Sequence, residues 1–273
     1  MSREPYVFYQ IDAFASSAFE GNQACVMPLA DWSLPDDTLQ KIAAENNVAE
    51  TAFLVRTAED TWDLRWFTPA IEVPLCGHAT LASAHALFSH EGFAGETITF
   101  QTRKSGQLTV SRAGDGYEMD FPAAPIKQVD VSDSLVEALG ARPKAVWAGA
   151  YVAAVFETAD EIRALSPDQN KLKAIDLSEG EPGCVGCLAV GGPDGADITS
   201  RFFAPGAGLP EDPATGSWHC MVAPVGKVLL GQDTARCFQA YPGRGAWIET
   251  QLVGDRVKLR GQAVTVIEGR FFM

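Results

Sequence analysis

Apolar positions along the chain fall mostly into short runs of strand length, and a few stretches change to the three-to-four-residue spacing of helices. This pattern predicts a mixed α/β protein in which hairpin turns, rich in glycine, join many of the strands. The predicted strands cover residues 7–15, 24–29, 51–55, 62–67, 98–102, 108–111, 117–121, 145–156, 184–190 and 198–203. Helical spacing is clearest in three stretches: one that ends near Asn46, one that follows Gly77, and residues 217–230.

The stretch from Arg65 reads RWFTPAIEVPLCGHATLASAHALF and has an echo that begins at Arg201 with RFFAPGAGLPEDPATGSWHC. Four positions of the first stretch have the same residue type 136 positions later. The matching pairs are Arg65 and Arg201, Phe67 and Phe203, Pro69 and Pro205, and Pro74 and Pro210. The repetition predicts an internal duplication, with one copy in each half of the chain.

Each copy has a proline-containing loop that closes on a glycine, Gly77 or Gly216, and opens into a helix from His78 or Ser217. The first turn of a helix carries unpaired N–H donors and the positive end of the helix dipole, which together attract an anion. The two helix ends predict a small carboxylate held between two domains. The first helix has small or apolar residues on every side and should be buried, whereas Pro224 predicts a kink or a shortened segment in the second.

Length and charge fit a two-domain protein that binds a small molecule. The chain has 273 residues, enough for two ordinary domains. Its 35 acidic and 21 basic residues give a net charge of −14, and without a basic run nucleic acid is not an expected partner. The first residues lack a signal-peptide pattern, and no apolar run reaches about 18 residues. We therefore expect a cytoplasmic protein with no membrane partner.

Most of the six cysteines lie in apolar surroundings and are expected to be small buried hydrophobic residues rather than disulfide partners. Cys184 and Cys187 have CxxC spacing, but they lie inside the apolar run CVGCLAV. Neither a second such pair nor a nearby histidine pair accompanies them, so we do not expect a zinc site there.

Several segments in a fixed order resemble one known family. They are GNQACV (21–26), IAAENNVAETAF (42–53), RWFTPAIEVPLCGHATLASA (65–84), EDPATGSWHC (211–220), GRG (243–245) and GDRVKLRGQAVTV (254–266). In combination they closely resemble the PhzF-like family, named for an isomerase of phenazine biosynthesis, in the diaminopimelate-epimerase-like superfamily. The resemblance covers essentially the whole chain.

The resemblance implies an α/β (α+β) fold of the diaminopimelate-epimerase type. Such a fold has two pseudo-symmetric domains, each a curved, mostly antiparallel sheet around a central helix, and the active site lies in the cleft between them. We expect an N-terminal domain over 1–122, joined by the last strand at 263–273, and a C-terminal domain over 123–262. A homodimer is usual for the family.

The resemblance also implies the site. Glu50 would be the acid/base, and His78, Asp212 and Ser217 would hold the substrate or help to protonate it. The implied substrate-binding positions are Gly77, Ala79, Thr215 and Gly216. The implied reaction, similar to that of trans-2,3-dihydro-3-hydroxyanthranilate isomerase, uses no cofactor and no metal: a proton leaves one carbon of a small conjugated amino or hydroxy acid and returns at another. Such chemistry needs one carboxyl group that both takes and gives a proton in an enclosed site.

Two alternatives stay open. Racemases and epimerases of this fold use two cysteines as thiolate base and thiol acid. Cys76 occupies the first of these places but Thr215 occupies the second, which disfavours two-thiol chemistry and leaves a racemase that uses Glu50 or one thiol with water. The other alternative is a non-catalytic dimer that binds a small carboxylate.

Trp218, directly after Ser217, predicts a smaller or more aromatic pocket.

Overall fold

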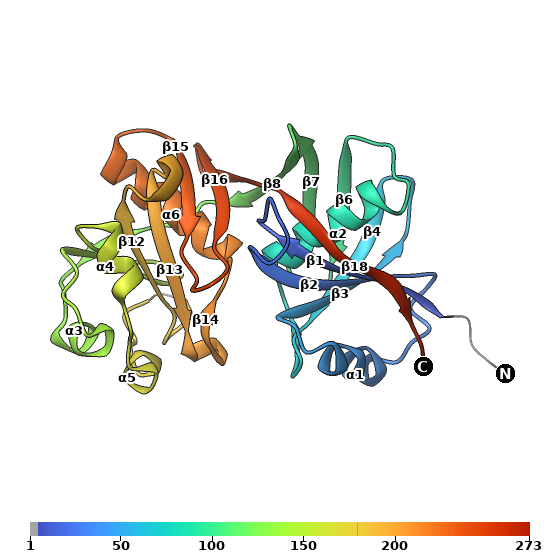
Figure 1. The fold of residues 1–273 in the computed structure, drawn as a ribbon, viewed down its shortest axis with the longest axis horizontal. Helices are drawn as coiled ribbons and strands as arrows, with labels where there is room; N and C mark the ends of the chain where they lie inside the picture. The colour runs from blue at the N-terminus through green and yellow to red at the C-terminus, as the bar shows by residue number, and fades with distance from the viewer. Residues whose placement is uncertain (1–4, 179) are drawn as a thin grey trace. The chain divides into compact units, whose positions relative to one another are not determined.

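The computed structural model describes residues 5–178 and 180–273, which divide into two compact units (Figure 1). Unit 1 comprises Met1–Asp120 and Arg260–Met273, and unit 2 comprises Phe121–Leu259. The chain passes from one unit to the other within β8 (Gly116–Pro122) and again within β17 (Arg256–Gly261). None of the described helices is both long and apolar enough to cross a membrane.

Unit 1 is a mixed sheet with a central helix. Its strands are paired in the order β18–β1–β2–β3–β4–β6–β7–β8, and the short β5 pairs with β4. In Figure 1 the C-terminal strand β18 lies beside β1 near the start of the chain. The elements not yet delimited are β1 (Tyr6–Ala13), β2 (Asn22–Leu29), α1 (Asp36–Asn46), β3 (Glu50–Arg56), β4 (Thr61–Phe67), β5 (Glu72–Val73), α2 (Gly77–Ser89), β6 (Thr97–Thr102), β7 (Gln107–Ala113) and β18 (Ala263–Phe271).

Unit 2 has a sheet ordered β9–β10–β11–β12–β13–β15–β16, with β14 paired to β13. Its strands are β9 (Lys127–Val129), β10 (Ala145–Ala148), β11 (Val152–Val155), β12 (Val185–Val190), β13 (Ile198–Ala204), β14 (Leu209–Asp212), β15 (Thr234–Gln239) and β16 (Ala246–Val253). Its helices are α3 (Asp133–Leu139), α4 (Ala159–Ala164), α5 (Gln169–Lys173), η1 (Pro193–Gly195), η2 (Pro205–Ala207) and α6 (Gly216–Leu230).

The two units repeat one topology. Strands β1 to β7 and strands β10 to β16 pair in the same order and in the same directions. The parallel pairs are β2–β3 and β4–β6 in unit 1, and β11–β12 and β13–β15 in unit 2. The other pairs in these two sets are antiparallel. Parallel neighbours need a long crossover, and the central helices α2 and α6 supply equivalent ones. The fold therefore supports the predicted duplication.

The two copies differ in the length of one loop. Helices α2 and α6 begin at Gly77 and Gly216, 139 positions apart, whereas the preceding arginines are 136 apart. The second loop is therefore three residues longer. Pro74 corresponds in place to Pro213 rather than to Pro210, so that member of the predicted echo was paired wrongly.

Helix α2 is buried on nearly every side, as its small side chains predict: ten of its 13 residues are buried. Helix α6 continues through Pro224 to its last residue, so the shortened segment expected there is wrong. A proline in a helix leaves the carbonyl four residues earlier without its N–H partner. Here that carbonyl, on Cys220, accepts a hydrogen bond of 3.2 Å from the N–H of Ala124. The proline is therefore tolerated without an unpaired backbone group.

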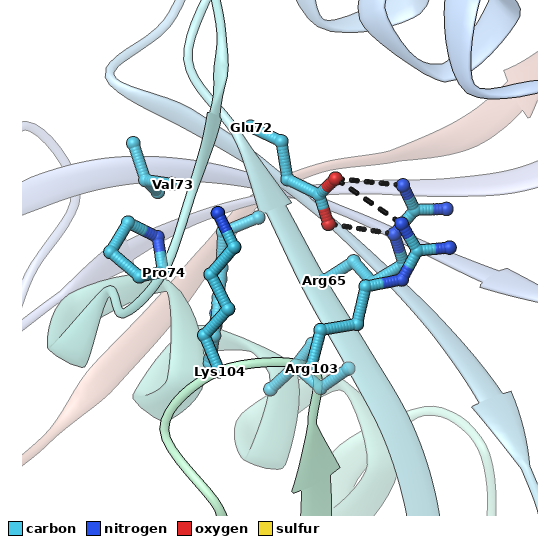
Figure 2. Close-up of a pocket in the computed structure, with 8 residues that line it drawn as sticks. Arg65, Glu72, Val73, Pro74, Arg103 and Lys104 are labelled. Atoms are coloured by element: carbon cyan, nitrogen blue, oxygen red, sulfur yellow. Dashed lines mark hydrogen bonds and ion pairs between the residues drawn. The ribbon is translucent and has the colours of Figure 1, made fainter.

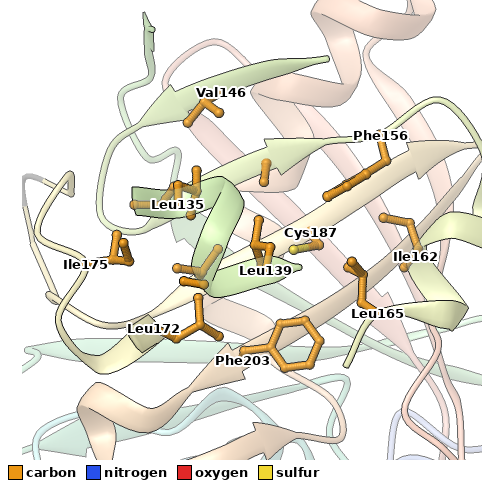
Figure 3. Close-up of a cluster of buried hydrophobic side chains, with 14 of the residues drawn as sticks. Leu135, Leu139, Val146, Phe156, Ile162, Leu165, Leu172, Ile175, Cys187 and Phe203 are labelled. Carbon is orange, nitrogen blue, oxygen red and sulfur yellow. The ribbon is translucent and has the colours of Figure 1, made fainter. Parts of the chain in front are cut away.

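Buried side chains on the two faces of the unit 2 sheet form separate apolar clusters. Figure 3 shows the first, where α3, α4 and α5 pack on strand residues that include Cys187 and Phe203. The second cluster lies around α6 and contains Phe202 and Trp218. Successive residues of a strand face opposite sides, which explains why neighbours in β13 join different clusters.

Trp218 is fully buried in the second cluster. Its ring lies so close to Gly186 of β12 that a Cβ at that glycine would come within 2.4 Å of it. Trp218 therefore fills the core of unit 2, and the expectation that it lines a smaller or more aromatic pocket is wrong.

A buried arginine fastens the loop before each central helix. In unit 1 the Arg65 guanidinium is 4% exposed and donates from Nε and Nη2 to the two carboxylate oxygens of Glu72, at 2.8 and 2.9 Å. Figure 2 shows this bidentate pair, with Arg103 also reaching Glu72. The hydrogen bonds from Arg65 hold the pKa of Glu72 below its ordinary value. Arg65 also stacks over Phe67, 5.0 Å from the ring centre.

We call the bidentate arginine–glutamate pair the clamp, and unit 2 has the same clamp made by the same atoms. Arg201 donates from Nε and Nη2 to the two carboxylate oxygens of Glu211, each at 2.7 Å, and its guanidinium lies 4.8 Å from the ring centre of Phe203. The third nitrogen, Nη1, donates to the Leu165 carbonyl at 2.7 Å. The arginine, phenylalanine and glutamate of each copy thus form a cluster that ties the short strand β5 or β14 to the main sheet.

We expect Arg201→Met to lower the free energy of unfolding by about 3–5 kcal/mol, because it leaves the Glu211 carboxylate, 12% exposed, without its charged partner. Urea denaturation followed by circular dichroism measures the change. The matched control is the double variant Arg201→Met/Glu211→Met, which removes both charges and should recover part of the loss. A double variant less stable than the single one would contradict the clamp's role.

Candidate active site

Glu50 is the first residue of β3, and local structure explains its position. Helix α1 ends at Asn47, whose φ of 50° places it in the left-handed conformation that often ends a helix. The preceding Asn46 donates from its side-chain amide to the Thr51 hydroxyl at 3.0 Å, which joins the helix end to the strand. In the parallel pairing of β2 and β3, Glu50 lies opposite Ala24. Its side chain is 13% exposed.

His78, the second residue of α2, points its ring at Glu50. Its Nε2 lies 3.1 Å from the Glu50 carboxylate, although the two atoms are not aligned for a regular hydrogen bond. On the other side, Nδ1 lies 3.3 Å from the side-chain amide nitrogen of Asn22 and 3.4 Å from the Cys76 sulfur. Strands β2 and β3 and the start of α2 thus bring a carboxylate, an imidazole, an amide and a thiol together.

Burial and neighbouring charge determine how this cluster titrates. Burial raises the pKa of the Cys76 thiol to about 11, with a further upward effect of Glu50, so the thiol is protonated at neutral pH. Burial alone would lower the pKa of His78, but the acidic groups of Cys76 and Glu50 raise it well above its ordinary value. The surroundings of His78 therefore favour the charged form of its ring.

Atoms of Glu50, Cys76 and His78 lie within 4.8 Å of one another, the spacing of a small metal site. The thiol, however, faces Nδ1 of the ring and the carboxylate faces Nε2. A single ion cannot reach both sides of the imidazole as the ring lies, since each ligand must bond through its own lone pair. The geometry suits proton transfer better than metal binding.

In unit 2 the loop before α6 is organised by a buried glutamine. Gln239, at the end of β15, accepts a 2.9 Å hydrogen bond from the Thr215 N–H and donates a 2.7 Å bond to the Asp212 carbonyl. The Thr215 hydroxyl donates to the Asp212 carboxylate. The Thr215 N–H is therefore held by Gln239 and its hydroxyl by Asp212, whose carboxylate is fixed from within the loop.

Ser217, the second residue of α6, holds the place in unit 2 that His78 holds in unit 1. Its hydroxyl oxygen accepts a 2.9 Å hydrogen bond from the phenol of Tyr151. The residue before each helix, Cys76 or Thr215, makes no side-chain hydrogen bond that caps the helix. A helix without such a cap offers its first amide groups to a ligand.

The structure thus gathers the predicted site residues into two sets. Glu50 and His78, with Gly77 and Ala79 in the first turn of α2, lie in unit 1. Those in unit 2 are Asp212, Thr215, Gly216 and Ser217. Both helices begin at the glycine, one residue earlier than predicted.

Sequence reasoning missed the supporting residues Asn22, Tyr151 and Gln239. Asn22 had a signal, because it lies in the GNQACV segment that carries part of the resemblance. Gln239 offered only a polar residue at the end of a strand, and Tyr151 stood among small residues with no pattern around it.

Comparison with known proteins identifies the family. The model of the phenazine biosynthesis-like proteins, PhzC–PhzF, matches residues 11–269. The chain belongs to this family. A Pseudomonas aeruginosa protein named an uncharacterized isomerase is 41% identical to this PhzF-like chain, and the alignment covers 96% of each. The crystal structure of a PhzF-family phenazine biosynthesis protein from Enterococcus faecalis superimposes with a TM-score of 0.93 at 36% identity, over 99% of this chain and 100% of that one.

The predicted fold class is also confirmed. A hydroxyproline epimerase from Agrobacterium vitis shares only 12% sequence identity, yet it superimposes with a TM-score of 0.56 over 100% of this chain and 94% of its own. At such identity the likeness concerns the fold alone. Together with the PhzF-family structure it confirms the diaminopimelate-epimerase-like architecture that the sequence segments implied.

Low pH should lower the free energy of unfolding of the PhzF-like chain through His219. This residue lies in α6, just after the loop that contains Thr215. Burial lowers the pKa of His219 to about 4, although its Nδ1 is bonded to the Thr215 carbonyl at 2.8 Å. An unfolded histidine titrates near 6.5, so the stability that the neutral ring contributes is present above pH 6.5 and is lost as pH falls toward 4. The loss can reach about 3 kcal/mol.

Urea denaturation of the wild type and of His219→Gln at pH 7, 6, 5 and 4 measures this effect. Glutamine can still donate to the Thr215 carbonyl but does not titrate, so the wild type should lose more stability than the variant over this range. Parallel curves for the two proteins would show that His219 does not carry the acid sensitivity.

Proposed function

We propose that this chain is a cofactor-independent isomerase that moves a proton between two carbons of a small conjugated amino or hydroxy acid. One observation carries the proposal: the nearly buried Glu50 carboxylate, at the start of β3, lies 3.1 Å from the imidazole of His78 in the first turn of α2. Membership of the PhzF-like family supports it, since curated relatives of this family are named isomerases. The homodimer implied by the resemblance stays a prediction.

In the proposed reaction the Glu50 carboxylate takes a proton from one carbon of the substrate and returns it to another. A single group can do both because the proton remains on Glu50 between the two steps. The acidic neighbours of His78 raise its pKa, which favours the charged imidazolium. Its positive charge offsets the negative charge of the carboxylate before the proton moves and that of the substrate afterwards.

The remaining predicted residues would bind and orient the substrate. The first amide groups of α2 and α6, which no side chain of Cys76 or Thr215 caps, would hold the substrate carboxylate. Asp212 would contact its amino or hydroxyl group, and Ser217 would donate to an oxygen of its carboxylate. In this proposal unit 1 supplies the group that carries the proton, and unit 2 supplies groups that bind polar substituents of the substrate.

Glu50→Gln should abolish turnover while fold and ligand affinity are retained, because glutamine fills the same space but cannot carry the proton. We expect kcat to fall at least about 10²-fold. The measurement is NMR in D₂O on the purified protein with a panel of dihydroaromatic amino acids, hydroxy amino acids and ordinary amino acids. Deuterium should enter a carbon at a new position with the wild type only.

The same experiment separates the competing functions. Turnover by Glu50→Gln within a few-fold of wild type would remove Glu50 as the acid/base. Deuterium at the α-carbon with inversion of configuration would instead indicate a racemase. Exchange at no carbon of any compound in the panel would favour a protein that binds a small carboxylate without turning it over.

The thiol form of the racemase alternative rests on Cys76, whose sulfur lies 3.4 Å from His78. Its thiol is poorly suited to act as a base, because its pKa is raised to about 11 by burial and by Glu50. The equivalent residue before α6 is Thr215, which cannot serve as the second thiol. A one-carboxylate reaction therefore agrees better with the site.

Cys76→Ser should change kcat/KM by less than about fivefold if the isomerase proposal is right, because the hydroxyl preserves the contact with His78 and the thiol takes no proton. Steady-state kinetics on the substrate found by NMR provide the measurement, with Cys25→Ser as a control for a buried cysteine away from His78. A loss of several orders of magnitude in Cys76→Ser alone would revive the thiol mechanism.

A further inference from the structure

Tyr151 stands where a tight turn presents it to the start of α6. It directly precedes β11, and the N–H of Gly149 donates to the Tyr151 carbonyl at 3.0 Å, which closes the turn. A side chain at Gly149 would collide with the Pro125 carbonyl, 2.5 Å from the Cβ position. The tyrosine is 8% exposed, and its phenol donates to Ser217 Oγ at 2.9 Å.

The aromatic core of unit 2 fixes the ring of this tyrosine. Tyr151 packs edge-on against Phe202 with ring centres 4.8 Å apart, and Phe202 stacks on the buried Trp218 at 5.8 Å. Trp218 is in turn locked over Gly186. The phenol oxygen therefore projects from a rigid stack, which favours one direction for its hydrogen bond.

Unit 1 has a comparable contact. Asn22 at the start of β2 lies 3.3 Å from the ring of His78, the second residue of α2. Tyr151, directly before β11, contacts Ser217, the second residue of α6. Strands β2 and β11 are equivalent in the duplicated topology, although by register Tyr151 takes the place of Ala24 rather than that of Asn22. Each unit thus joins the start of its second strand to the first turn of its central helix, through different residues.

The direction of the Tyr151 bond determines what Ser217 can do. The phenol O–H is the donor in this bond, and burial raises the pKa of Tyr151, so the phenol keeps the proton that it donates. The serine oxygen accepts this hydrogen bond and keeps its own O–H for another partner. A hydroxyl that accepts one hydrogen bond is also a better donor for the next.

We propose that Tyr151 is a positioning residue for Ser217: its O–H donates to Ser217 Oγ and turns the serine proton toward an oxygen of the substrate, for which a carboxylate is the matching chemical class. The inference rests on the proposed function for its substrate, but the hydrogen bond on which it depends can be tested without one.

The test replaces the serine hydroxyl with a titratable reporter. In Ser217→Cys a donor at the position of Tyr151 stabilises the thiolate, so the thiol pKa should be lower than in the double variant Ser217→Cys/Tyr151→Phe. The rate of alkylation by iodoacetamide as a function of pH, read by mass spectrometry of the peptide that contains position 217, gives both values. The six native cysteines are buried, which leaves the introduced thiol as the accessible one.

We expect the alkylation midpoint of Ser217→Cys to lie about one pH unit below that of the double variant. The start of α6 affects both thiols equally and cancels in the comparison. Equal midpoints in two folded variants, with folding checked by circular dichroism, would overturn the proposal. The alkylation result does not depend on turnover. If the Glu50→Gln variant proved active, the proposed function would be refuted, but the assignment of Tyr151 would not be affected.

Kinetics then test the positioning role on the substrate. Tyr151→Phe should lower kcat/KM about tenfold in the wild-type background and have no further effect in Ser217→Ala, because it acts through the serine. Independent, multiplying effects would mean that Tyr151 serves the core or the substrate directly, and would overturn its assignment as a positioning residue.

Discussion

The buried guanidinium groups of Arg65 and Arg201 are the constraint on which both site loops depend. Each is bonded through two nitrogens to a glutamate on a short strand that leads directly into a central helix. A buried charge that loses its partner is very costly, so few loop conformations are compatible with the clamp. The first turns of α2 and α6, with their donors and functional side chains, are held in place as a consequence.

Duplication preserved this backbone frame while the chemistry of the copies diverged. At equivalent places unit 1 has Cys76 and His78, and unit 2 has Thr215 and Ser217. In unit 1 these side chains lie beside the Glu50 carboxylate, which is 3.1 Å from the His78 ring and helps to raise the pKa of that ring. In unit 2 the corresponding loop is a network of hydroxyl and amide groups built on Gln239. The two copies thus share backbone positions but carry different side-chain chemistry at them.

Much of this could be predicted from sequence, because the duplication, the glycine before each helix and the helix-to-strand joint at Glu50 are local patterns. Other features depend on contacts that no local pattern records. Gln239 reaches a loop 24 residues away, and Tyr151 meets Ser217 across 66 residues. Trp218 was assigned to a pocket because it follows Ser217, but consecutive helical residues point about 100° apart, and the tryptophan turns into the core.

The duplication also bears on the kind of proton transfer. A racemase with two bases needs an acid/base group on each side of one carbon, and a duplicated fold could supply it from equivalent places. The place of Glu50, the first residue of β3, is taken in unit 2 by Cys184, which directly precedes β12 and whose backbone carbonyl accepts a hydrogen bond from the N–H of Val152. Burial raises the pKa of the Cys184 thiol to about 11, and Glu181 beside it adds to the shift. Unit 2 therefore has no ready proton carrier at that place, and a reaction in which Glu50 alone takes and returns the proton is the one that this asymmetry favours.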